Sequence, residues 1–168
     1  MRFMESVPRI AWTTTKAGGD RQHPLNPILF VHYSDSPGRS LDTFAEQRDA
    51  IRAIRDYHVN TRGWSDIGYS YVLTQPWGTR AGKVRVWTGR GRYRIPAAQM
   101  GANYGNLAVC VIGNAHEPVA KRTVGAIADL AKRVGARDIK GHRDVNDTDC
   151  PGDRLYALIP QMKRLASL

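Results

Sequence analysis

No stretch of this 168-residue sequence approaches the ~18 consecutive apolar residues that a membrane-spanning helix needs. The first residues, MRFMESVPRIAW, also lack the apolar core and the small-residue cleavage site of a secretory signal peptide. The sequence has no internal repeat, low-complexity tract or interdomain linker. We therefore expect one domain that is made in the cytoplasm and is not inserted into a membrane.

Cysteine is scarce, because the chain has only Cys110 and Cys150. Cys110 lies in the apolar run LAVCVIGN and is expected to be buried as a small hydrophobic side chain. Cys150 lies in a polar loop. Because cytosolic synthesis disfavours a disulfide between them, we expect both thiols to be free.

Acidic residues are outnumbered, with 15 Asp and Glu against 25 Lys and Arg, which gives a net charge of +10. Six cations share the segment RAGKVRVWTGRGRYR: Arg80, Lys83, Arg85, Arg90, Arg92 and Arg94. A basic surface attracts polyanions such as nucleic acid, anionic membranes and phosphate-rich wall polymers. The same six cations would also fit a solvated basic face that serves only solubility. The chain lacks a recognisable nucleic-acid-reading motif, so no nucleic acid partner is expected.

Strand and helix patterns alternate along the chain and predict a single α/β domain with a central sheet flanked by helices. Residues 1–27 look irregular, and the ordered domain is expected over 28–168. Apolar or alternating runs predict strands at 28–33, 68–74, 83–89, 107–114 and 136–141. Helical spacing predicts helices from a cap at Ser40 to about Asn60, over 119–134, and from Asp153, with an interruption at Pro160.

Two histidines and one cysteine follow predicted strands. His32 ends the strand at 28–33, His142 follows the strand at 136–141, and Cys150 lies in the loop GHRDVNDTDCPGD. Two imidazoles and a thiolate are a known ligand set for catalytic Zn²⁺, which lowers the pKa of a bound water to about 7. Spacing alone leaves open that each histidine is simply hydrogen-bonded.

Four segments carry a resemblance to a known family: FVHYSDS, YHVNTRGWSDIGYSYVL, GNLAVCVIGN and GHRDVNDTDCPGD. They resemble the type-2 N-acetylmuramoyl-L-alanine amidases, which include amidase-type phage lysozymes and the peptidoglycan recognition proteins. The segments occur in the family's order and cover most of residues 28–156. The resemblance implies a mixed sheet with a zinc site at one edge, and a hydrolase that cuts the amide between N-acetylmuramic acid and L-alanine.

The resemblance also implies roles for individual residues. Zinc would be held by His32, His142 and Cys150, and Tyr69 would assist the zinc-bound water. Thr148 would be a second catalytic residue; it falls where phage lysozymes carry a lysine and recognition proteins carry a threonine. Gln99, where the family often has histidine, and Asn103 are expected to contact the substrate. Apart from the resemblance, Trp87 and Arg90 in the basic segment are two further candidate contacts, although a tryptophan in that place is more often core or turn packing.

Two classes of function fit this reading. The first is a wall-degrading enzyme whose partner is bacterial peptidoglycan, most simply a monomeric phage endolysin made in the host cytoplasm that acts on the wall after release. Its basic segment would bind anionic wall polymers. The alternative is a catalytically weak peptidoglycan-binding module, and the presence of Cys150 favours the enzyme.

Overall fold

The computed structural model describes residues 4–36, 41–75 and 84–168. Its centre is a six-stranded sheet with the strand order β1-β4-β3-β5-β2-β6. The strands are β1 (Met4–Val7), β2 (Ile28–Tyr33), β3 (Tyr71–Thr74), β4 (Val84–Thr88), β5 (Leu107–Val111) and β6 (Asp138–Gly141). The β3–β4 pair is antiparallel and the other pairs are parallel, so the predicted mixed sheet of a single α/β domain is confirmed.

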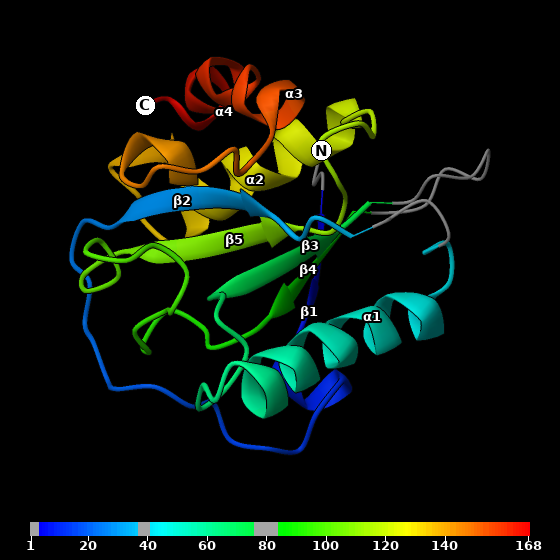
Figure 1. Cartoon of the computed structure of the whole chain (residues 1–168). Helices are drawn as coiled ribbons and strands as arrows, with labels where there is room; N and C mark the ends of the chain where they lie inside the picture. Colours follow the sequence, from blue (N-terminus) through cyan, green and yellow to red (C-terminus); the bar gives the residue numbers. More distant parts are fainter. Residues whose placement is uncertain (1–3, 37–40, 76–83) are drawn as a thin grey trace.

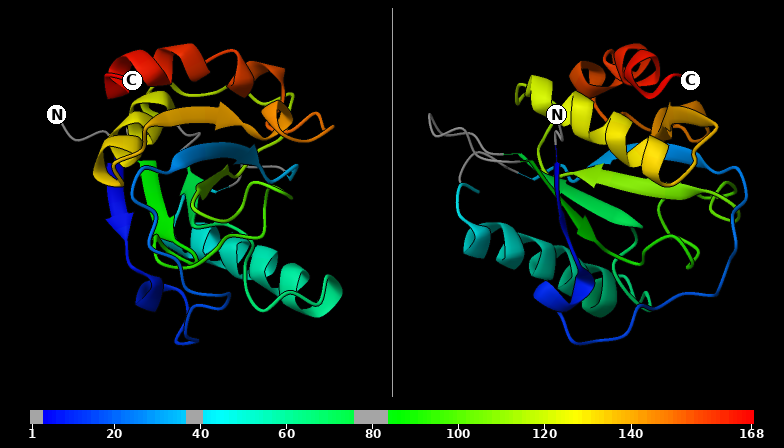
Figure 2. Two further views of the ribbon diagram at one scale, coloured as in Figure 1. Left: turned by 90° about the vertical axis from the view of Figure 1, so that its left-hand side faces the viewer. Right: turned by 180° about the vertical axis from the view of Figure 1, so that it is seen from behind.

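Helices cover both faces of the sheet (Figures 1 and 2). Helix α1 (Phe44–Asp56), which continues into a π-helical turn at Tyr57–Thr61, lies on one face. Helices α2 (Lys121–Arg133) and α4 (Ile159–Ala166) pack together on the other, and the short α3 (Asp153–Tyr156) precedes α4. The sheet therefore separates two apolar clusters, one under each helical layer.

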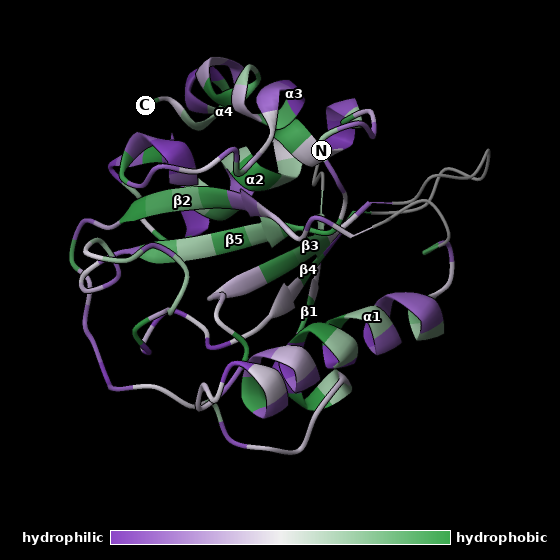
Figure 3. Ribbon diagram, in the orientation of Figure 1, coloured by the Kyte–Doolittle hydropathy of each residue, from purple (hydrophilic) through white to green (hydrophobic). Residues whose placement is uncertain are grey.

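The central strands are buried because both of their faces are covered. Every residue of β5 is buried, and only the last residue of β2 is partly exposed. Figure 3 shows these strands as hydrophobic, while the connecting loops are mostly hydrophilic. Such continuous apolar runs are typical of parallel strands between two helical layers.

Two expectations about the elements need correction, and a third is confirmed. The segment 1–27 is not irregular throughout, because β1 forms the edge of the sheet and pairs with β4. Helix α1 begins with a capping box between Thr43 and Glu46, while the predicted cap Ser40 lies outside the described residues. The expected interruption of the last helical segment is confirmed, because α3 ends at Tyr156 and Pro160 lies in the first turn of α4, where a missing N–H has no cost.

No helix among the described residues is long and apolar enough to cross a membrane.

Candidate metal centre

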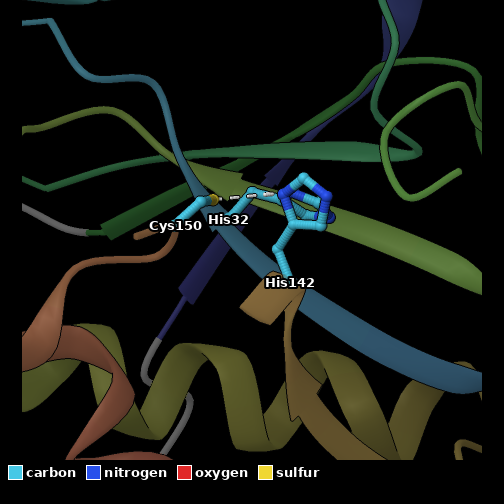
Figure 4. Close-up of side chains that lie close together, drawn as sticks. All are labelled: His32, His142 and Cys150. Carbon is cyan, nitrogen blue, oxygen red and sulfur yellow. Dashed lines mark hydrogen bonds between the residues drawn. The ribbon is translucent and has the colours of Figure 1, made fainter. Parts of the chain in front are cut away.

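Parallel pairing of β2 with β6 brings the two predicted histidine ligands together. Val31 is the partner of Gly141 in that ladder, so His32 and His142 leave neighbouring strands at the same end. Their ring centroids are 4.6 Å apart. The sulfur of Cys150 lies 3.7 Å from Nδ1 of His32. One ligand atom from each residue lies within 4.8 Å of the others, and Figure 4 shows the three side chains converging.

Hydrogen bonds fold the loop after β6 back so that Cys150 reaches the histidines. The carbonyl of Cys150 accepts from the backbone N–H of Arg143 at 3.0 Å. Its backbone N–H donates to the hydroxyl of Thr148 at 3.2 Å. Gly152 then turns the chain at φ 80°, with Ala115 so close that a side chain there would be strained. The Pro-Gly after the cysteine therefore ends the loop at a fixed position.

Both imidazoles are hydrogen-bonded on their outer nitrogen by a side-chain amide. Nε2 of His32 lies 3.0 Å from Oε1 of Gln99, and Nε2 of His142 lies 3.0 Å from Oδ1 of Asn146. An amide oxygen only accepts, so Nε2 is the protonated nitrogen in each ring. The lone pair of each histidine is then on Nδ1, the atom that faces Cys150 in His32.

Burial sets the charge of the three ligands. It lowers the pKa of His32 to about 3, with the charge of His142 acting in the same direction and the bond to Gln99 against it. It also lowers the pKa of His142 and raises that of the Cys150 thiol to about 11. The imidazoles are therefore neutral, which is the form that binds metals, and a cation must displace the thiol proton.

The arrangement of donors fits a zinc ion. With Zn–N of about 2.0–2.1 Å and Zn–S of about 2.3 Å, tetrahedral ligand atoms are roughly 3.3–3.7 Å apart. The Cys150–His32 separation of 3.7 Å matches this edge, and ligand atoms as far apart as 4.8 Å would have to approach by roughly 1.1–1.5 Å. Three protein ligands leave the fourth position open, as in catalytic zinc sites.

The three ligands lie in a cleft with a volume of about 740 Å³. Tyr69 and Thr148, the two predicted catalytic residues, also line it. The ring of Tyr69 is 5.5 Å from that of His32. Burial, the main cause, raises the pKa of Tyr69 well above 10, so its hydroxyl is a neutral donor at all physiological pH values.

Sequence reasoning missed a further part of the lining of the cleft. Tyr57, His58, Arg62 and Trp64 line it, with the guanidinium of Arg62 lying 5.2 Å from the centroid of the Trp64 ring. The α1 periodicity does not show this, because the π-helical turn at Tyr57–Thr61 changes the direction of the side chains. The motif TRGWSDIGY could have indicated that Arg62 and Trp64 belong to the site. From the sequence, only Tyr69 of this motif was assigned to it.

Comparisons with known proteins find amidases and peptidoglycan recognition proteins. The chain is 33% identical over 164 residues to human N-acetylmuramoyl-L-alanine amidase, covering 90% of this chain and 27% of that protein. It is 29% identical to mouse peptidoglycan recognition protein 1, covering 91% of this chain and 85% of that protein. The structure of Drosophila PGRP-LB matches with a TM-score of 0.78 and 26% identity, over 92% of this chain and 91% of that one. No family model matches.

The chain resembles the type-2 amidases and peptidoglycan recognition proteins over about 90% of its length and has their fold. It spans about a quarter of the human and pig amidases, which match it over 27% and 26% of their lengths. The relatives found are animal proteins, and they give no support to a phage endolysin.

Two of the family-based substrate contacts lie in the loop before β5 and face the protein instead. Gln99 is fully buried and bonded to His32, so the prediction that it contacts substrate is contradicted. The side-chain oxygen of Asn103 accepts from the backbone N–H groups of Ala98 and Gln99, at 3.1 and 3.0 Å. The amide of Asn103 thus closes the turn that carries Gln99.

The other two expected contacts are also contradicted. Trp87 is fully buried on β4 and donates to the hydroxyl of Thr74, so it cannot stack on a glycan. The guanidinium of Arg90 donates to the backbone carbonyls of Ile67 and Ile95 at 2.7 and 2.8 Å. Arg90 therefore supports the loop before Tyr69 from inside the protein.

The basic segment does not form a set of free surface charges. Arg85 pairs with Glu5 at 3.2 Å. Arg92 and Arg94 donate to the backbone carbonyls of Pro24 and Gly19, at 2.6 and 2.9 Å. With Arg90 buried, four of the six cations are engaged within the fold, while Arg80 and Lys83 lie outside the described residues. The arginines lend no support to the predicted binding of anionic wall polymers.

Proposed function

We propose that this chain is a zinc-dependent N-acetylmuramoyl-L-alanine amidase acting on bacterial peptidoglycan. The observation that carries the proposal is the convergence of His32, His142 and Cys150 at the wall of an open cleft. The amidases among its relatives support the same reaction. A structure of Drosophila PGRP-LB, 25% identical to this chain, was obtained in complex with tracheal cytotoxin, and this supports a peptidoglycan fragment as the ligand of the cleft.

The reaction adds water across the amide between the lactyl group and L-alanine. The carbonyl carbon gains an oxygen, the C–N bond breaks, and the alanine nitrogen leaves as an amine after taking up a proton. Zinc, when bound by the three ligands, supplies Lewis acidity toward the carbonyl and lowers the pKa of water. Without a cation, the neutral imidazoles and the protonated thiol offer no comparable activation.

Tyr69 is the residue best placed to assist the chemistry. Its raised pKa keeps the phenol protonated, so it can donate a hydrogen bond to negative charge that develops on the carbonyl oxygen. Thr148 lines the same cleft, but its hydroxyl already accepts the N–H of Cys150. We therefore assign Thr148 first to the position of Cys150, and its direct part in the reaction stays a prediction.

A peptidoglycan-binding module is the second candidate. It is favoured by the recognition proteins, which match the chain over most of their own lengths. The predicted phage origin, host-cytoplasmic synthesis and later action on the wall remain sequence-based predictions that the animal relatives do not support.

Digestion of purified peptidoglycan, followed by mass analysis of the soluble products, tests the proposal. The wild-type protein should release stem peptides with a free L-alanine amine. Cys150→Ser should release none, because the third ligand is lost. Tyr69→Phe should act roughly 10²-fold more slowly, the usual cost of one oxyanion donor, with its zinc content unchanged. Zinc-loaded wild-type protein that binds peptidoglycan but releases no peptide would establish the binding module instead.

A further inference from the structure

The metal ligands are supported by a pair of side-chain amides that neither the resemblance nor the comparisons assign. We propose that Gln99 and Asn146 are positioning residues that hold His32 and His142 with Nε2 protonated and Nδ1 directed to the metal. The inference rests on the proposed zinc site, and it names the residues that prepare the site before the ion binds. We call Gln99 and Asn146 the amide pair.

Gln99 reaches His32 from the loop between β4 and β5. It is fully buried, and its Oε1 lies 3.0 Å from Nε2 of His32. Its own position is fixed by Asn103, whose side chain accepts the backbone N–H groups of Ala98 and Gln99. A buried amide held in this way has no freedom to contact a ligand in the cleft, and its oxygen is committed to the imidazole.

Asn146 does the same for His142 from within the loop after β6. Its Oδ1 lies 3.0 Å from Nε2 of His142, and its backbone N–H donates to the carbonyl of that histidine at 3.2 Å. Its side-chain nitrogen donates to the backbone carbonyl of Met100 at 3.2 Å. Because Met100 follows Gln99 directly, this bond joins the two supporting loops across the metal site.

The chemistry explains why amides suit this position. A histidine that binds metal through one nitrogen must carry its proton on the other, and an acceptor at that nitrogen fixes both the tautomer and the ring orientation. Carboxylates often fill this role, but they add a negative charge. Two neutral amides select the tautomer while leaving the Cys150 thiolate as the anion of the ligand trio.

Zn²⁺ affinity, measured by competition with a chromophoric chelator at fixed pH, tests the amide pair. Gln99→Leu and Asn146→Leu remove the acceptors and should each weaken Zn²⁺ binding by about 10-fold or more, the usual effect of losing such a partner. Gln99→Glu and Asn146→Asp keep an acceptor and should restore most of the affinity. The control is Gln22→Leu, because Gln22 is also a buried amide of this layer, but it bonds only backbone groups.

Long-range ¹H–¹⁵N spectra of the metal-free protein separate this inference from the proposed function. Wild-type spectra should show the Nε2–H tautomer for both histidines, and each Leu variant should show a mixture at its own histidine. These spectra test the role of the amide pair even if the wild type binds no zinc. Absence of zinc binding would refute the proposed zinc amidase but not the role of the amide pair. Folded Leu variants with wild-type tautomers and wild-type affinity would overturn the inference. An equal loss of affinity in Gln22→Leu would also overturn it.

Discussion

His58 is a neutral histidine buried in the wall of the cleft. Its Nδ1 accepts the backbone N–H of Gly68 at 3.0 Å, one residue before Tyr69. Burial, together with the charges of Arg62 and Arg90, lowers the pKa of His58 to about 4, from an ordinary value of 6.5. Protonation of Nδ1 would remove the acceptor for Gly68 and place a second cation beside Arg62.

This shift predicts a loss of stability in mild acid. The folded pKa is lower than the unfolded one, so the unfolded chain gains a proton first as the pH falls. The contribution of His58 is thus complete above pH 6.5 and is lost between pH 6.5 and about 4. Urea unfolding at about pH 7 and about pH 4.5 should differ by less in His58→Asn than in wild type, by on the order of 2 kcal/mol.

Asparagine keeps an acceptor near the position of Nδ1 but does not titrate. The comparison with wild type is needed because His32, whose pKa is lowered to about 3, contributes in the same pH range. Identical pH dependence in the two proteins would show that His58 is not neutral in the folded state.

The chemical type of a side chain is readable from sequence, but its direction is not. His32, His142 and Cys150 could be predicted because their residue types, in motifs of a known family, indicate a metal site. Trp87 and Arg90 could not be placed correctly, because an Arg-rich alternating segment predicts a half-exposed strand and gives no sign of guanidinium groups that bind internal carbonyls. From the sequence, Gln99 was expected to contact the substrate in place of the family's histidine. Only the structure shows that it is buried and bonded to His32, one of the three proposed metal ligands.

The loop between α1 and β3 carries one wall of the cleft and is fixed by a buried carboxylate. Asp66 has no exposed side-chain surface and pairs with Arg9 at 3.0 Å and Arg55 at 2.9 Å. It also accepts the backbone N–H of Gly18 at 3.0 Å. Burial opposes its ionisation, but the bonds from Gly18 and Arg9 hold its pKa below the ordinary value. One side chain therefore joins the N-terminal segment, α1 and the loop that ends at Tyr69.

Asp66→Asn should be strongly destabilising. The amide removes the negative charge and leaves Arg9 and Arg55 largely buried without a counter-ion, so we expect a loss of about 3–5 kcal/mol in the free energy of unfolding. The matched control is Asp49→Asn, which breaks the exposed pairs with Arg48 and Arg52 and should have little effect on stability. Urea denaturation measures both, and similar losses in the two variants would refute a special role for Asp66.

Helices and strands with a clear pattern were predicted well, and those whose identity depends on distant partners were not. Strand β2 has the expected bounds because a six-residue apolar run between turn signals has few alternatives. Strand β1 was missed because its four residues become a strand only by pairing with β4, about 80 positions later. Strand β3 begins later than expected, at Tyr71, because the chain from Gly68 to Ser70 instead bonds residues after β4.

The position of the metal centre is a property of the whole sheet. The order β5-β2-β6 makes β2 a neighbour of β6, a strand more than 100 residues later in the sequence, and the register of Val31 with Gly141 aligns the two histidines. Local patterns predict that these strands exist but not that they pair, so the convergence was expected only through the family resemblance. The fold also determines where the arginines of the basic segment lie. Arg90, Arg92 and Arg94 donate hydrogen bonds to backbone carbonyls.

Elemental analysis of the purified protein tests the central claim most directly, because every proposed step depends on an ion held by His32, His142 and Cys150. The wild type should contain one zinc ion per chain, and Cys150→Ser, purified in parallel, should contain almost none while retaining its circular dichroism spectrum. Full zinc occupancy in Cys150→Ser would place the metal elsewhere. Peptidoglycan hydrolysis by wild-type protein that holds no transition metal would contradict the account altogether.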